Sequence, residues 1–173
     1  MSSVQQDVIL LPQDECAVEA VLIPGALLVA LRRYQQVTTS DPESGGMILG
    51  RIRDPFLDVS NVTFPASGDR KSRHLFVRKD RTHHEAAVYL WEHSNHEVGY
   101  LGEWHTHPED HPKPSSTDLK GWMKVIRDGH SPFCLFIIVG KKTSYYCVGY
   151  SCEDKVITFF EFGMDDASAQ VLR

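Results

Sequence analysis

The segment between residues 102 and 118 gathers side chains that can bind a metal ion or move a proton. His105 and His107 stand two residues apart at the end of an expected strand, where alternate side chains point to one face. Two imidazoles so placed can converge on one ion, at about 2.0–2.1 Å if the ion is zinc. Asp118, in the first turn of an expected helix, can add a carboxylate. Two histidines and one carboxylate leave a fourth position for water, which is the catalytic arrangement of zinc sites.

The loop between these candidate ligands also carries chemistry. Three prolines restrict its backbone, so it can return the start of the helix to the two histidines. Glu109 and Asp110 lie in the same loop and could in principle replace Asp118 as the carboxylate ligand. The helix-start position favours Asp118.

A hydrolytic metal site needs a base that takes a proton from the attacking water. Glu43 precedes a Ser-Gly-Gly run, and glycines permit close approach of backbone, so Glu43 could lean over the site. Ser115 could donate a hydrogen bond to the water or to a developing oxyanion. Ser115 could equally serve only as the N-cap of the helix, with Asp118 as the other half of a capping box.

The residues around the histidine pair have simpler expected roles. Glu103 should share a face with His105 and could orient a ligand imidazole, whereas Trp104 should point into the core. His111 could line the substrate cleft, support a ligand or face solvent. His74 and His130 have no identifiable partner. The histidines of the second expected helix are predicted to be non-metal surface residues: His83, His84, His93 and His96.

Hydrophobic periodicity predicts several strands and about three helices. The expected strands cover residues 8–11, 16–22, 46–53, 57–64, 73–78, 98–106, 133–139, 144–150 and 155–162. The expected helices cover residues 26–36, 82–96 and 115 or 116 to 127. The first two strands should form a hairpin. This order indicates an α/β protein of the α+β type without regular βαβ alternation. One domain is expected over residues 1–173, with a core at about 20–162 and a loose tail at 163–173.

Composition restricts the possible partners. The 173 residues carry a formal net charge of −5, from 18 Lys and Arg against 23 Asp and Glu. This balance argues against nonspecific binding to nucleic acid or an anionic membrane, which requires a basic face. Residues 69–81 are locally basic and are expected to form a solvated loop and strand edge. The N-terminus lacks a signal-peptide pattern, and the longest apolar run is too short to span a bilayer. A soluble cytoplasmic protein is the expectation.

The four cysteines are not expected to bind metal. Cys16, Cys134, Cys147 and Cys152 form no C-x-x-C pair. Cys134 and Cys147 lie in apolar strand patterns and are predicted to pack as small core hydrophobes.

Three motifs together resemble the JAMM (MPN+) metallopeptidases: E-S-G-G-M-I-L-G from Glu43, H-x-H-P from His105, and S-x-x-D from Ser115. The interval between His107 and Asp118 also matches, and the resemblance covers roughly residues 20–160. It implies a JAB/MPN-like curved, mixed sheet flanked by about three helices, with cytidine-deaminase-like layering. It also implies that His105, His107 and Asp118 bind Zn²⁺, that Glu43 is general base and acid, and that Ser115 stabilises the oxyanion. The family cleaves isopeptide or peptide bonds next to the C-terminus of ubiquitin-like modifiers.

A longer run, G-E-W-H-T-H-P-E-D-H-P-x-P-S, preceded by D-R-K-S-R from Asp69, is similar to the Prok-JAB peptidases of bacterial CBASS anti-phage systems. This resemblance implies a deconjugating isopeptidase acting on the C-terminus of a CD-NTase, a cyclic-oligonucleotide synthase. Such an enzyme works opposite an E1–E2 type ligase, with no nucleic-acid or membrane partner.

The sequence leaves two candidate edges for substrate binding and two alternative functions. An extended substrate tail should pair with an exposed strand edge, which residues 46–53 or 73–78 could provide. The same site could instead process the C-terminus of a sulfur-carrier or ubiquitin-like protein. A non-catalytic MPN scaffold is disfavoured, because such scaffolds usually lack a metal ligand and this chain has all of them.

Overall fold

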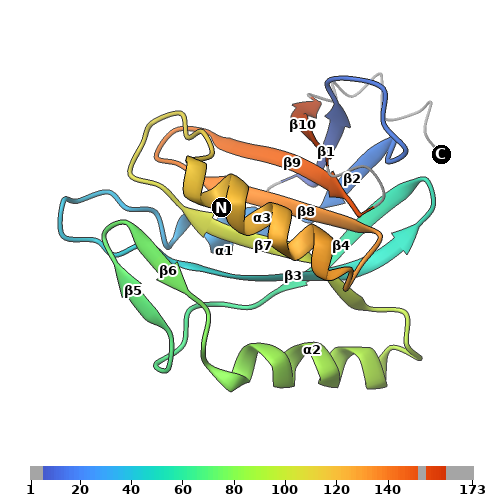
Figure 1. Cartoon of the computed structure of the whole chain (residues 1–173), viewed down its shortest axis with the longest axis horizontal. Helices are drawn as coiled ribbons and strands as arrows, with labels where there is room; N and C mark the ends of the chain where they lie inside the picture. The colour runs from blue at the N-terminus through green and yellow to red at the C-terminus, as the bar shows by residue number, and fades with distance from the viewer. Residues whose placement is uncertain (1–5, 152–154, 163–173) are drawn as a thin grey trace.

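Eight strands close a barrel at the centre of the structure (Figure 1). The computed structural model describes residues 6–151 and 155–162. The barrel strands are β1 Val8–Pro12, β2 Ala20–Ile23, β3 Gly45–Arg53, β4 Phe56–Val62, β7 Gly99–Thr106, β8 Phe133–Val139, β9 Ser144–Tyr150 and β10 Lys155–Phe162. Their hydrogen-bonded order is β1–β10–β9–β8–β7–β3–β4–β2, and β2 pairs again with β1.

Two strand pairs of the barrel are parallel, and the others are antiparallel. β2 runs parallel to β4, and β7 runs parallel to β8. Parallel neighbours need a crossover connection, and α3 (Ser116–Asp128) supplies it between β7 and β8. The loop that leaves the end of β7 therefore leads directly into the N-terminus of α3.

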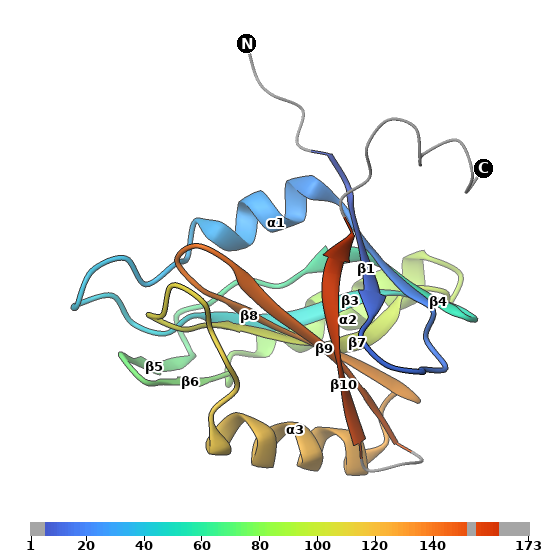
Figure 2. The ribbon, with the colours of Figure 1, turned by 90° about the horizontal axis from the view of Figure 1, so that it is seen from above.

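The helices lie on different sides of the barrel. α1 (Gly25–Arg32) and α3 lie on opposite sides when the barrel is seen from above (Figure 2). α2 (Arg81–His93) runs along a third side, beside β3 and β7 (Figure 1). The side chain of Asp80 caps the start of α2, where it accepts a hydrogen bond from the backbone N–H of Thr82.

Apolar packing fixes α3 against the barrel. Trp122 and Ile126 of α3 pack on a buried cluster that includes Phe136 of β8 and Cys147 of β9. The rings of Trp122 and Phe136 are stacked, with centroids 4.6 Å apart. Full burial of one such apolar side chain contributes about 1.5–3 kcal/mol. Cys134 also lies in this cluster, so both strand cysteines are core residues as predicted.

A separate hairpin lies beside one end of the barrel (Figure 1). β5 (Arg70–Ser72) and β6 (Leu75–Val77) pair only with each other among the described residues. The strand predicted at 73–78 is confirmed as β6, but β5 and the turn at Arg73 and His74 were not predicted. Three paired residues on each strand are too few for an alternating pattern to mark the turn.

The α+β class is confirmed: within the described residues, three helices lie beside a mixed, strongly curved sheet. β1 and β2 pair antiparallel as expected, but β2 starts at Ala20 and not at residue 16. α1 ends at Arg32, earlier than expected, and α2 ends at His93, before Asn95 and His96 adopt positive φ. The tail predicted at 163–173 lies outside the described residues. In the part of the chain that the structure describes, no helix is long and apolar enough to cross a membrane.

Candidate metal centre

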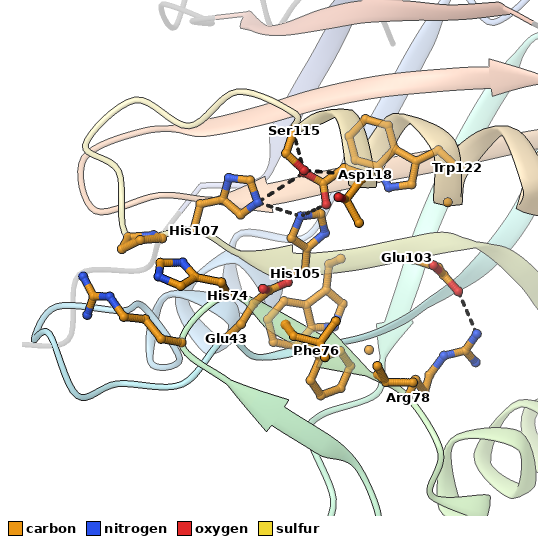
Figure 3. A pocket seen from close by; sticks show the side chains of 18 of the residues that line it. Glu43, His74, Phe76, Arg78, Glu103, His105, His107, Ser115, Asp118 and Trp122 are labelled. Atoms are coloured by element: carbon orange, nitrogen blue, oxygen red, sulfur yellow. Dashed lines mark hydrogen bonds and ion pairs between the residues drawn. The ribbon is translucent and has the colours of Figure 1, made fainter.

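The side chains of His105, His107 and Asp118 converge at the end of β7 (Figure 3). The two imidazole Nε2 atoms lie 3.1 Å apart. Asp118 places Oδ1 3.3 Å from His105 Nε2 and Oδ2 3.4 Å from His107 Nε2. A tetrahedral ion with bonds of about 2.0–2.1 Å needs donor atoms about 3.3–3.4 Å apart. The spacing and the chemistry of the three donors therefore fit a small, tetrahedrally coordinated cation.

The local backbone explains how the two histidines come to one face. His105 pairs with Ile138 in the ladder between β7 and β8. The backbone N–H of His107 donates to the carbonyl of Val139 at 3.0 Å, which continues this pairing one residue beyond β7. The chain is thus extended from His105 to His107, and alternate side chains point the same way.

A capping box aims the carboxylate of Asp118. The Asp118 N–H donates to Ser115 Oγ at 3.1 Å, and the Ser115 N–H donates to Asp118 Oδ2 at 2.6 Å. The helix-cap interpretation of Ser115 is therefore confirmed. In the cap, Oγ accepts from the Asp118 N–H, and the Ser115 side chain also hydrogen-bonds the Asp118 carboxylate at the wall of the cleft.

The charges of the site favour a cation. Burial alone would raise the pKa of Asp118, but hydrogen bonds from His105, His107 and Ser115 hold it well below its usual range. Burial alone would lower the pKa of His107, but the hydrogen bond and charge of Asp118, followed by the charge of Glu43, raise it overall. The negative potential that draws a proton to His107 would equally draw a metal ion.

Glu43 lies beside the histidines, before the start of β3. Its carboxylate points toward His105 (Figure 3). Burial raises the pKa of Glu43, while the charges of His105 and His107 act in the opposite direction. The side chain is half-buried. A desolvated carboxylate with a raised pKa is a better proton acceptor than a carboxylate in water.

Two glycines let the chain after Glu43 approach β7 closely. A Cβ at Gly45 would lie 2.6 Å from the carbonyl oxygen of Trp104 and 2.6 Å from the ring of Phe76. A Cβ at Gly46 would overlap the carbonyl group of Thr63. Larger residues would push this segment, and Glu43 with it, away from the site.

The candidate ligands and Glu43 line a cleft of about 680 Å³. The hairpin forms its opposite wall with residues 73–78, and His74, Phe76 and Arg78 are drawn there in Figure 3. Ser115 and Glu109 line the same cleft. Residues 73–78 were expected as one possible substrate edge, but His74 and Phe76 were not assigned to the site individually, because the turn that brings them there was not predicted.

The structure decides the open roles of two residues near the ligands. Glu103 does not orient an imidazole; it accepts a hydrogen bond from Arg78 at 2.7 Å. Of the three roles open to His111, the solvent-facing one is confirmed: it is exposed, is bonded to Thr143 Oγ1 at 3.1 Å and does not line the cleft. Trp104 is a core residue as expected, only 1% exposed.

The basic segment is largely as predicted. Residues 69–81 form exposed loops and the β5–β6 hairpin, as expected of a solvated loop and strand edge. The side chain of Asp69 is the exception: it is 0% exposed and bonded at 2.8 Å to His83, which is 1% exposed. The prediction that His83 is a surface residue is wrong because this pair closes the base of the hairpin, a contact that local sequence does not reveal.

Comparison with known proteins agrees with the fold and the motif. A family model described as prokaryotic homologs of the JAB domain matches residues 26–150. The chain belongs to this family. Two relatives bear the name CD-NTase/cGAS isopeptidase. The Pseudomonas aeruginosa protein is 36% identical over 120 residues, covering 68% of this chain and 75% of its own length. The Vibrio cholerae protein is 41% identical over 125 residues, covering 70% of this chain and 77% of its own length.

A solved structure shares the fold of this Prok-JAB chain. The solution structure of protein DSY2949 from Desulfitobacterium hafniense superposes with a TM-score of 0.51 at 19% sequence identity. The match covers 80% of this chain and 86% of that one. At this identity the likeness supports the fold alone.

Proposed function

We propose that this Prok-JAB chain is a JAMM-type zinc isopeptidase that removes conjugates attached through the C-terminus of a CD-NTase. The convergence of His105, His107 and Asp118, with donor atoms 3.1–3.4 Å apart, carries the proposal. Relatives named CD-NTase/cGAS isopeptidase support the substrate. The enzyme would act in the cytoplasm within a CBASS anti-phage system, opposite the E1–E2 type ligase that makes the conjugate.

His105, His107 and Asp118 would hold the zinc ion, which would supply Lewis acidity and a water of lowered pKa. Glu43 would accept a proton from the attacking water and deliver it to the leaving amine as the C–N bond breaks. Ser115 would donate a hydrogen bond from its hydroxyl to the developing oxyanion and keep its proton. The capping box bonds Ser115 and Asp118 to each other, so it keeps the two side chains in a constant relative position.

The tail of the substrate would lie along β6. The alternative edge at residues 46–53 is excluded, because β3 pairs with β4 on one side and with β7 on the other. β6 pairs with β5 on one side only among the described residues, and its residues line the cleft. Three residues of β6 would pair with roughly 10 Å of extended tail, at about 3.3 Å per residue.

Cleavage of a defined conjugate tests the proposal. A CD-NTase joined through its C-terminal carboxyl to a lysine of a carrier protein is incubated with the zinc-loaded enzyme. We expect cleavage after the last CD-NTase residue, identified by mass spectrometry, with loss on chelation and recovery on adding zinc. His107→Ala should abolish cleavage, whereas His111→Ala, in the same loop, should leave it within about threefold.

Other outcomes would overturn the proposal. Cleavage of a sulfur-carrier fusion without cleavage of the CD-NTase conjugate would assign the site to the second substrate class. A purified protein that binds no zinc and cleaves neither substrate would indicate a scaffold.

A further inference from the structure

The hairpin that walls the cleft shares no strand pairing with the barrel among the described residues. Other bonds must therefore hold it in place. Its position matters for Glu43, because the backbone N–H of Glu43 donates to the carbonyl of Ser72 at 2.7 Å. The side-chain amide of Gln36 also donates to the carbonyl of Arg73 at 2.8 Å. A displaced hairpin would move both the β6 edge and the backbone of Glu43.

Asp69 ties the two ends of the hairpin together at its base. Its carboxylate accepts hydrogen bonds from the backbone N–H groups of Ala66, Lys79 and Asp80, at 2.8, 2.8 and 2.9 Å. Asp80 returns the link, since its side chain accepts from the N–H of Gly68 at 2.7 Å. One buried carboxylate therefore fixes the backbone on both sides of the hairpin.

His83 connects this carboxylate to the barrel. One ring nitrogen, Nε2, lies 2.8 Å from Asp69 Oδ2, and Nδ1 lies 2.6 Å from Thr63 Oγ1. Thr63 Oγ1 also accepts from the N–H of Met47 in β3, and the carbonyl of Thr63 accepts from Trp104 Nε1, next to His105. These distances let His83 donate from Nε2 to the Asp69 carboxylate and accept at Nδ1 from the Thr63 hydroxyl.

The row of carboxylate, imidazole and hydroxyl has the order of a hydrolytic triad, but it is no second active site. The Thr63 hydroxyl is already bonded to Met47 and His83, and Thr63 does not line the cleft. A buried carboxylate–imidazole pair between the hairpin and the barrel is instead suited to holding the hairpin in a fixed position against the barrel.

We propose that Asp69 and His83 are positioning residues that hold the β5–β6 hairpin over the cleft. The inference rests on the proposed function, because the hairpin matters to catalysis only if a substrate tail lies along β6. The pair would act on tail binding through the β6 edge, and on Glu43 through its bond to Ser72.

Asp69→Asn and His83→Gln test this role. The probe is a CD-NTase C-terminal tail fused by a peptide bond to a fluorescent protein, cleaved by the zinc-loaded enzyme. We expect each variant to raise KM about tenfold, the effect of one lost charge-assisted hydrogen bond, and to lower kcat by less than about threefold through the smaller shift of Glu43. Amide exchange of residues 70–80 should accelerate while the zinc content stays unchanged. The double variant should be little worse than either single one, because both remove the same link.

Leu10→Ala is the matched control for lost stability. Leu10 is 0% exposed and lies on β1, across the barrel from the cleft. Its truncation should destabilise the fold but leave KM unchanged at a temperature where every variant is folded. A KM rise in Leu10→Ala equal to that in Asp69→Asn, or unchanged KM in His83→Gln, would overturn the proposal. If the wild-type enzyme cleaves no substrate, the proposed function fails, whereas unchanged amide exchange at 70–80 in the variants would refute the positioning role itself.

Discussion

Replacing Glu43 by Gln isolates the proposed general base with little change in shape. The amide fills the same half-buried space between the histidines and the hairpin, but it cannot take a proton from water. The three candidate metal ligands and the Ser115–Asp118 capping box are untouched. Any loss of activity in a metal-loaded variant can therefore be attributed to proton transfer.

The size of the loss follows from the role of Glu43. General acid–base catalysis contributes about 10²–10⁴-fold, and each factor of ten corresponds to about 1.36 kcal/mol of activation free energy. We expect kcat to fall about a thousandfold, or about 4 kcal/mol, because Glu43 would serve as base and then as acid. Ser115 and the bound metal would account for the residual rate.

Although Glu43→Gln should lose activity, its metal-free form should not lose stability. Burial raises the pKa of Glu43 above its ordinary value of 4.5, so the charged carboxylate is less stable in the folded protein than in the unfolded chain. This cost grows as pH rises from 4.5 through the folded pKa. Above that range, metal-free Glu43→Gln should be at least as stable as the metal-free wild-type protein.

Single-turnover cleavage, zinc content and urea unfolding with and without zinc measure these effects. Glu85→Gln is the control, since Glu85 lies on α2, is exposed, pairs with Arg81 and does not line the cleft. It should change the rate less than about tenfold. Wild-type cleavage by metal-loaded Glu43→Gln would refute the base assignment, and loss of zinc from that variant would make Glu43 a ligand instead.

Four further predictions concern metal binding and stability. Zinc at about 100 times its Kd should raise the free energy of unfolding by about 2.7 kcal/mol, a shift seen by urea unfolding and absent in His107→Ala. The affinity of the site for zinc should fall at acidic pH, because the raised pKa of His107 means that the ion must displace a proton. Gly46→Ala should destabilise the fold by about 1–3 kcal/mol because its Cβ would overlap Thr63, whereas Gly121→Ala, with no atom within 4 Å, should be neutral or stabilising. Burial alone would raise the pKa of Asp69, but its hydrogen bonds lower it strongly, so wild-type stability over Asp69→Asn should be full above about pH 4 and shrink as pH falls further.

The candidate site could be predicted where one local segment contains all of the chemistry. His105 and His107 follow a strand, and Asp118 opens the next helix, so strand alternation and helix capping suffice to bring them together. Glu43 is different: only the pairing of β3 with β7, which sets Gly45 opposite His105, places it there. The sequence suggests that approach through two glycines, and the family motif adds the assignment.

The hairpin and its base could not be predicted because long-range bonds define them. Asp69 reads locally as part of a basic, solvated run, yet it is buried by bonds to residues 10–14 positions away. His83 opens a helix whose other residues are not buried, so its burial depends on Thr63 and not on the pattern of α2. Barrel closure is a similar case, since the pairing of β1 with both β10 and β2 joins the two ends of the chain.

The closed barrel makes the hairpin an exchangeable part. The barrel strands satisfy one another around the ring, and the metal ligands stand on β7, its continuing loop and α3. Residues 70–77 could therefore be replaced by a hairpin of another sequence while Asp69, Lys79 and Asp80 keep its base closed. Selectivity for different tails could then diverge between related enzymes without any change in the hydrolytic machinery, and chimeras made at these two junctions would transfer it.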